Sequence, residues 1–407
     1  MKDNYIFKTL FFTFLYVLST HIGLLLSFND GFATAVWPGS GLALCLLLIY
    51  GEKYWPAIAL GAFSINFIHG GSVGAASLIC IGNTLEALVA YKIIKLSADS
   101  SVNLTKLKSV INFIFASLIG AIISAAIGTL TVFLFSTTEI HFTKTIVTWW
   151  LGNVTSFLII VPIIMLLTKS SLLKLKNTNV LFSFFLLLIV CYFTFFLKYE
   201  SEVISKLFAY SLIVFPLYSS LKHNRLVALL MVFIISVSAI LGTISGNGSF
   251  VYSDLNNSLV LLQAFICSMS LTTLIVSTGV KELQSHQKDL TKLLIEKELL
   301  VSEIHHRVKN NLAIVSSLLF LQQEKFDNKD VREKIEETQF RIKSMALVHE
   351  KLYKNSSVYT VDFSSYIKEL TYNINSSYKS ADLQIQLNLN IEAHEIDINK
   401  ATPLGLI

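Results

Sequence analysis

The chain divides into a strongly apolar part and a polar part. Residues 1 to about 280 hold long apolar runs, whereas the remainder is rich in Lys, Glu, Gln and Asn. Because a helix needs about 20 apolar residues to cross the hydrocarbon core of a bilayer, the runs predict membrane-spanning helices. The third expected span is short enough to be re-entrant, so eight spans are an alternative to ten. The expected spans are residues 9–28, 33–50, 54–68, 74–94, 109–136, 145–167, 179–197, 203–220, 226–244 and 257–279.

Composition and charge also favour a membrane protein. Hydrophobic residues make up 53% of the 407 residues and charged residues 14%, which is too apolar for a soluble domain. The net charge of +5 comes from Lys and Arg scattered through loops, which favours a lipid bilayer over nucleic acid as the partner. Ten spans with a cytoplasmic N-terminus leave only Lys144, Lys198 and Lys206 in the outer loops. We therefore expect a multi-pass protein of the bacterial cell (inner) membrane, with its N-terminus and C-terminal part in the cytoplasm.

Polar residues within the spans are candidate sensor residues. Glu86 stands out because a charge at the bilayer centre costs at least about 2.5 kcal/mol. It is a ligand contact, a proton site or a residue near the cytoplasmic interface. Asn66 and Asn83 are expected to form interhelical hydrogen bonds, and Trp37 near a span end is typical of an aromatic belt. The four cysteines lack metal-ligand spacing, so we expect no metal site.

Five motifs follow one another in the apolar part: WPGSGLA from Trp37, GEKYWP from Gly51, GAFSIN from Gly61, GNTL from Gly82 and WWLG from Trp149. Together they resemble the MASE-type membrane-associated sensor domain over roughly residues 10–280. One departure is Asn153, where that family is expected to carry an acidic residue. The resemblance implies an integral membrane sensor coupled to a cytoplasmic output.

The pattern changes after about Val280 to an apolar seam. Its members follow heptad-like spacing, which suits a parallel two-stranded coiled coil over residues 281–300. A single amphipathic helix packed elsewhere is the alternative. The seam residues are Leu283, Leu290, Leu293, Leu300 and Ile304.

Two adjacent histidines follow the seam in the segment EIHHRVKNNL. At about 100° per residue, His306 points away from the apolar face that begins at Ile304, and His305 lies on its flank. Glu303 and Asn310 share the exposed side with His306, one turn before it and one turn after it. A histidine that receives and passes on a phosphoryl group must be accessible, which favours His306. Surface polarity is the ordinary alternative, and metal binding is less favoured because neighbouring helix positions do not converge on one ion.

A second amphipathic helix is expected over residues 331–353, after a short turn at residues 326–330 with Asp330 as its N-cap. Two such helices joined by a short loop form an antiparallel hairpin, and two hairpins close a dimeric four-helix bundle. The predicted fold class is therefore mainly α: a polytopic membrane domain, a coiled-coil linker and this hairpin.

The segments EIHHRVKNNL, SSLLFLQ and MALVHEKLY are similar to the second subfamily of histidine kinase dimerisation and phosphoacceptor domains, over about residues 295–355. One departure is Ala313, where Gln is common in that family. The resemblance implies a homodimeric two-component kinase in which His306 takes phosphate from ATP and Mg²⁺ and passes it to an aspartate of a response regulator receiver domain. Glu303 or Asn310 is expected to orient His306.

The C-terminal segment is expected to begin an α/β ATP-binding domain. We expect a helix over residues 361–372 and strands over 383–389 and 396–398. The nucleotide-binding motifs of such domains do not occur before Ile407, so this chain is expected to lack the ATP site and to be inactive alone. The expected boundaries are 1–280 for the sensor, 281–300 for the signalling helix, 301–355 for the phosphoacceptor hairpin and 356–407 for the incomplete ATP-binding domain.

Two other functions compete with a kinase. A non-enzymatic receptor would signal through its coiled coil and would not need His306. A transporter would need polar clusters and inverted repeats across the spans, and neither is evident in the sequence.

Overall fold

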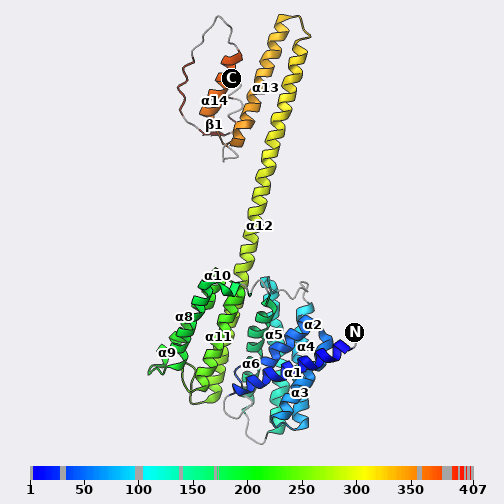
Figure 1. The fold of residues 1–407 in the computed structure, drawn as a ribbon, viewed down its shortest axis with the longest axis vertical. Helices are drawn as coiled ribbons and strands as arrows, with labels where there is room; N and C mark the ends of the chain where they lie inside the picture. The colour runs from blue at the N-terminus through cyan, green and yellow to red at the C-terminus, as the bar shows by residue number, and fades with distance from the viewer. Residues whose placement is uncertain are drawn as a thin grey trace. The chain divides into compact units, whose positions relative to one another are not determined.

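The computed structural model describes residues 3–27, 34–96, 104–136, 141–168, 172, 174–354, 360–377, 387–392, 395–397, 400 and 404. They belong to two compact units, Met1–Ser285 and His286–Ile407. Within the described residues both units are built mainly from helices, which confirms the predicted fold class (Figure 1).

Helices occupy all the expected spans of the first unit. Eight segments of the described residues are long and apolar enough to cross a membrane, so the protein is an integral membrane protein. The helices are α1 (Asp3–Leu25), α2 (Pro38–Tyr50), α3 (Trp55–Ile68), α4 (Val73–Leu96), α5 (Leu107–Phe135), α6 (Phe142–Leu166), α8 (Thr178–Phe196), α9 (Glu202–Ser211), α10 (Val214–Lys222), α11 (Arg225–Ile244) and the first part of α12 (Leu255–Gln323), with 3-10 turns η1 (Glu52–Tyr54) and η2 (Lys174–Lys176).

Helices α2 and α3 form a short pair. With 13 and 14 residues they reach only about 20 Å at 1.5 Å per residue, less than the hydrocarbon thickness. Pro38 begins α2, and Gly51 ends it with a φ of +92° that a side chain would strain. The Tyr5 hydroxyl donates to the Lys53 carbonyl at 2.7 Å. The turn between α2 and α3 therefore lies beside the start of α1.

The span expected over residues 203–220 is confirmed by the apolar segment Glu202–Lys222, which is long enough to cross a membrane. Within it the helix is interrupted between α9 and α10, because Pro216 has no N–H to donate and its ring crowds the preceding turn. The backbone N–H of Trp37 donates to the carbonyl of Gly152, in the middle of α6, at 3.4 Å. The start of α2 is thus placed deep among the other helices.

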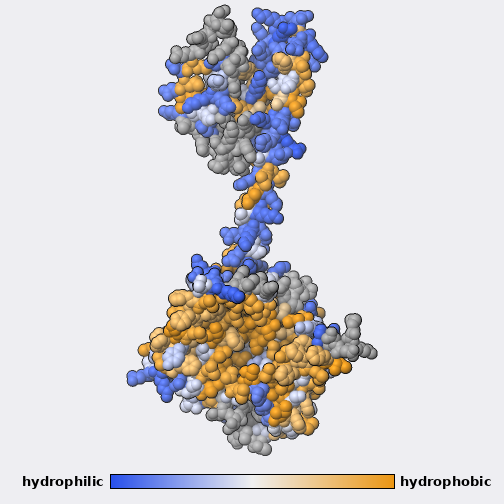
Figure 2. Space-filling view, viewed as in Figure 1, coloured by the Kyte–Doolittle hydropathy of each residue, from blue (hydrophilic) through white to orange (hydrophobic). Residues whose placement is uncertain are grey.

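Apolar side chains cover the outside of the first unit, and small residues let its helices approach closely. Figure 2 shows hydrophobic residues over most of the visible surface of this unit. Inside, a side chain at Gly120 of α5 would lie 2.9 Å from the Glu86 carbonyl of α4. This apolar exterior with close-packed glycines is typical of helices assembled in lipid.

The second unit begins with the continuation of α12, which runs without a break to Gln323. Helix α13 (Lys329–Lys354) returns alongside it, so the two form the expected antiparallel hairpin (Figure 1). The predicted N-cap was wrong by two residues. Asn328 caps α13, because its side chain accepts from the backbone N–H of Asp330 at 2.9 Å, which leaves Asp330 in the first turn.

A small α/β element follows the hairpin. Strand β1 (Thr360–Asp362) pairs antiparallel with β2 (Glu395–Asp397), with Val361 opposite Ile396. Helix α14 (Phe363–Ser377) starts later than the expected helix over 361–372, because Val361 is in β1 and Asp362 accepts from the N–H of Ser365. Of the strand expected over 383–389, residues 383–386 lie outside the described residues, and 387–389 are described without strand structure. Residues 401–403 and 405–407 also lie outside them.

Candidate functional site

A buried polar cluster surrounds Glu86 in the first unit. Glu86 lies on α4 and is fully buried. Its Oε2 accepts from the Ser40 hydroxyl of α2 and from the Asn153 amide of α6, each at 3.1 Å. One carboxyl group thus joins three helices. The N-terminus of α2 lies at this carboxyl, where the positive end of the helix dipole favours negative charge.

A second hydrogen-bonded set adjoins it. The Asn83 amide, one turn before Glu86 on α4, donates to the Tyr16 hydroxyl of α1 at 3.3 Å. The Ser124 hydroxyl of α5 donates to Asn83 Oδ1 at 2.8 Å. Asn83 therefore makes the interhelical bonds expected of it. Asn66 does not, because its amide donates to the Ala62 carbonyl of its own helix.

Helix α6 connects this cluster to α12. The Gln263 amide of α12 donates to the carbonyls of Thr148 in α6 and of Thr34. One helical turn further along α12, the Cys267 sulfur lies 2.9 Å from the Thr155 hydroxyl of α6. A displacement of α6 at Asn153 would therefore act directly on α12.

The end of the membrane part of α12 is also held. Arg225 at the start of α11 is buried and donates to the Thr278 hydroxyl at 2.9 Å. Glu282 accepts from the backbone N–H of Leu107, the first residue of α5, at 2.9 Å. These contacts fix the part of α12 that leads into the second unit.

The two histidines lie in the second-unit part of α12. The structure places His306 on the exposed side and leaves His305 half-buried. Glu303 and Asn310, one turn on either side of His306, are also exposed. The Glu303 carboxylate accepts from Arg307 Nε at 2.7 Å. A solvent-facing imidazole flanked by a carboxylate and an amide can accept a transferred group from a protein or nucleotide that approaches from solution.

An apolar stripe lies on the other side of this helix. Ile304 is 59% exposed, although Val308 and Leu312 on the same face are only half-exposed. Exposed apolar side chains at this spacing on a charged helix favour a partner helix. The further exposed members of the stripe are Leu283, Leu290, Leu293, Leu300, Val315 and Leu318.

Sequence reasoning missed several members of the buried cluster. Ser40 was inside a quoted motif and Asn153 was noted only as a departure, but their common contact with Glu86 depends on how α2, α4 and α6 pack. Gln263 had a detectable signal, since it is a lone amide in an apolar run. Among the described residues no group of three His, Cys, Asp or Glu side chains could hold a metal ion.

Family models match both parts of the chain in which these sites lie. The MASE1 family model matches residues 9–284, which contain the Glu86 cluster. A histidine kinase family model, HisKA_2, matches residues 303–378, which contain His306. No solved structure matches the chain.

Curated relatives match part of this chain. Sensor histidine kinase PdtaS of Mycolicibacterium smegmatis is 34% identical over 116 residues, which are 28% of this chain and 23% of that protein. PdtaS of Mycobacterium tuberculosis shows the same identity over the same length. The chain thus matches about a quarter of the length of these relatives. Because the MASE1 model covers well over half of the 407 residues, the chain belongs to the MASE1 family of membrane sensor domains, here followed by a histidine kinase domain.

Proposed function

We propose that this protein is a membrane sensor histidine kinase of a two-component system and that His306 is its phosphoacceptor. The observation that carries the proposal is the exposed imidazole of His306 on α12, within the segment matched by the histidine kinase model. The match to relatives named sensor histidine kinase supports the same function.

The reaction would make His306 the nucleophile. An unprotonated ring nitrogen forms a bond to the γ-phosphorus of ATP, the bond from that phosphorus to the bridging oxygen breaks, and ADP leaves with the electron pair. Positioning and charge neutralisation supply most of the catalysis in such transfers. The phosphoryl donor would be Mg-ATP, in which the metal ion neutralises charge on the phosphates. A response regulator aspartate would then take the phosphoryl group from the exposed ring.

Glu303 and Asn310 are the proposed positioning residues. Both lie within one turn of His306 on its exposed side, so either can contact the ring nitrogen that does not react. Glu303 would accept the proton that this nitrogen loses after transfer, while Arg307 fixes the carboxylate through their 2.7 Å ion pair. Glu303→Gln should lower the rate of labelling and flatten its pH profile, whereas a purely structural role would change neither.

The exposed stripe on α12 supports a homodimer, with two hairpins closing a four-helix bundle. The Lys and Arg distribution supports a cytoplasmic position for the second unit, because the outer loops of a ten-span arrangement hold few cations. ATP and response regulators would then have direct access to His306.

The test compares the two histidines in the protein as it occurs in membranes. With an intact histidine kinase of the same family present as the phosphoryl donor, we expect His306→Gln to abolish incorporation of acid-labile radiolabel from γ-labelled ATP. His305→Gln, the matched control one residue away, should retain most of it. Equal labelling of the wild type and the His306→Gln variant would contradict the proposal.

A further inference from the structure

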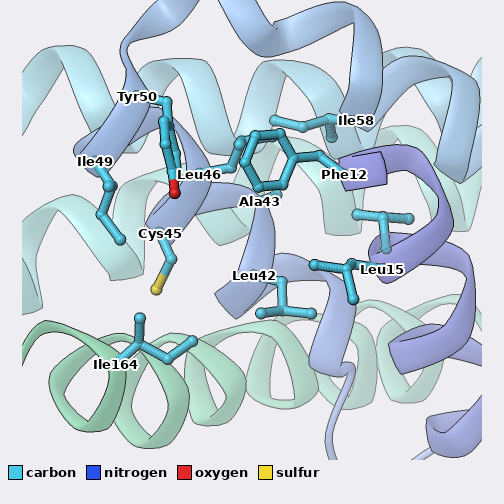
Figure 3. Close-up of a pocket in the computed structure, with 11 residues that line it drawn as sticks. Phe12, Leu15, Leu42, Ala43, Cys45, Leu46, Ile49, Tyr50, Ile58 and Ile164 are labelled. Atoms are coloured by element: carbon cyan, nitrogen blue, oxygen red, sulfur yellow. The ribbon is translucent and has the colours of Figure 1, made fainter. Parts of the chain in front are cut away.

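An apolar pocket opens on the side of the first unit, at α1 and α2. It has a volume of about 140 Å³. Figure 3 shows Leu42, Cys45 and Ile49 of α2 facing it, with Ile164 of α6 opposite and Phe12 and Leu15 of α1 beside them. Ala43, Leu46, Tyr50, Ile58 and Tyr16 complete the lining. Apolar walls of this kind favour hydrocarbon over water, and the open side lets an elongated chain extend beyond the pocket.

The rim of the pocket belongs to the lipid-facing surface. Ile49 is 50% exposed and Tyr50 is 42% exposed. Both line the pocket themselves, and they lie among apolar helices that would be surrounded by hydrocarbon. A ligand that enters from this side comes from the bilayer, so a hydrocarbon chain is the chemistry that the walls select.

Two cations stand at one end of the pocket. Lys8 Nζ lies 6.0 Å from the ring centre of Tyr50, a residue of the lining. Lys53 Nζ lies 5.3 Å from the ring centre of Tyr54, and the Tyr54 and Tyr50 rings are themselves in contact at 5.9 Å. Positive charge beside a hydrocarbon pocket at the end of membrane helices complements an anionic lipid headgroup.

We propose that this pocket binds a segment of one acyl chain of an anionic phospholipid whose phosphate faces Lys8 and Lys53. The apolar walls hold the chain, and the two ammonium groups select the charge of the headgroup. A neutral apolar solute would use the walls but not the lysines, and a soluble anion would use the lysines but not the walls.

The pocket shares Tyr16 with the polar cluster. The Tyr16 side chain lines the pocket, and its hydroxyl accepts from Asn83, one turn from Glu86. A bound chain would thus press on the residue that connects α1 to α4. This coupling rests on the proposed sensor function, whereas binding of the lipid does not.

The experiment measures retained lipid on the purified full chain by native mass spectrometry. The protein is exchanged into nanodiscs of phosphatidylcholine with or without phosphatidylglycerol and then released. We expect one phosphatidylglycerol to remain bound in preference to phosphatidylcholine. Filling the pocket with Leu42→Trp should reduce retention by about tenfold, whereas Leu188→Trp, on the exposed face of α8, should leave it unchanged.

A double variant of the two lysines leaves the apolar walls of the pocket unchanged. Lys8→Gln with Lys53→Gln should remove the preference for phosphatidylglycerol over phosphatidylcholine without loss of the folded protein. Equal retention of both lipids by the wild type would overturn the proposal. Equal amounts of phosphatidylglycerol retained by Leu42→Trp and Leu188→Trp would also overturn it.

Discussion

Exposed leucine and isoleucine side chains have different surroundings in the two units and therefore indicate different partners. Leu188 on α8 and Ile304 on α12 are 52% and 59% exposed. Around Leu188 nearly every neighbour on the helix is apolar, and the polar groups lie inside the unit, as at Glu86. Around Ile304 the helix is charged, and the apolar positions form a narrow stripe. The first pattern needs lipid, and the second needs another helix.

The largest effect should come from placing a charge in the stripe. Burial of one Ile side chain is worth about 1.5–3 kcal/mol, and a dimer contains two copies of Ile304. Ile304→Asp should therefore raise the dimer dissociation constant roughly 100-fold or more, as measured by analytical ultracentrifugation of the full chain in detergent. The control is Leu299→Asp, since Leu299 is similarly exposed but lies off the stripe. Equal effects of the two variants would show that the stripe is not an interface.

An intermediate effect should come from the buried carboxyl of the first unit. Glu86→Leu leaves the donors of Ser40 and Asn153 without their acceptor. Since each unpaired buried donor costs about 1–3 kcal/mol, the free energy of unfolding should fall by about 2 kcal/mol or more. Glu86→Gln keeps an acceptor oxygen and should lose less. A Leu variant as stable as the wild type would mean that the cluster does not hold the three helices together.

The smallest effect should come from an exposed ion pair of the same unit. Asp254, just before α12, accepts from Lys144 Nζ at 2.8 Å and from the N–H of Asn256. The hydrogen bond from Lys144 holds the pKa of Asp254 below its usual value of 3.8. The pair therefore contributes stability above that pH and loses it as the pH falls through the lower, folded-state pKa.

The pH dependence can be measured from unfolding midpoints of the chain in detergent, between about pH 6 and pH 3. Because the pair is exposed, the change should be small. Asp254→Asn should show a flatter profile than the wild type at the acid end. A profile that Asp254→Asn leaves unaltered would show that this carboxylate contributes nothing.

Much of this arrangement was accessible from the sequence, because run length and periodicity are local properties. The spans, the hairpin and the outward position of His306 follow from apolar spacing alone. The depth of Trp37 does not, since it depends on the contact between its backbone and Gly152 of α6. The same holds for Ser40 and Asn153, whose role appears only when three helices pack around Glu86. The N-cap of α13 could not be predicted either, because Asn328 and Asp330 are both residue types that cap helices well and the turn geometry selects between them.

The most direct measurement concerns where phosphate attaches. The chain is incubated with an intact histidine kinase of the same family and ATP, and the modified residue is located by mass spectrometry under conditions that preserve phosphohistidine. We expect a single phosphoryl group on His306. Phosphate on His305 alone, or on neither histidine while the donor kinase phosphorylates itself, would contradict the assignment of His306 as the phosphoacceptor.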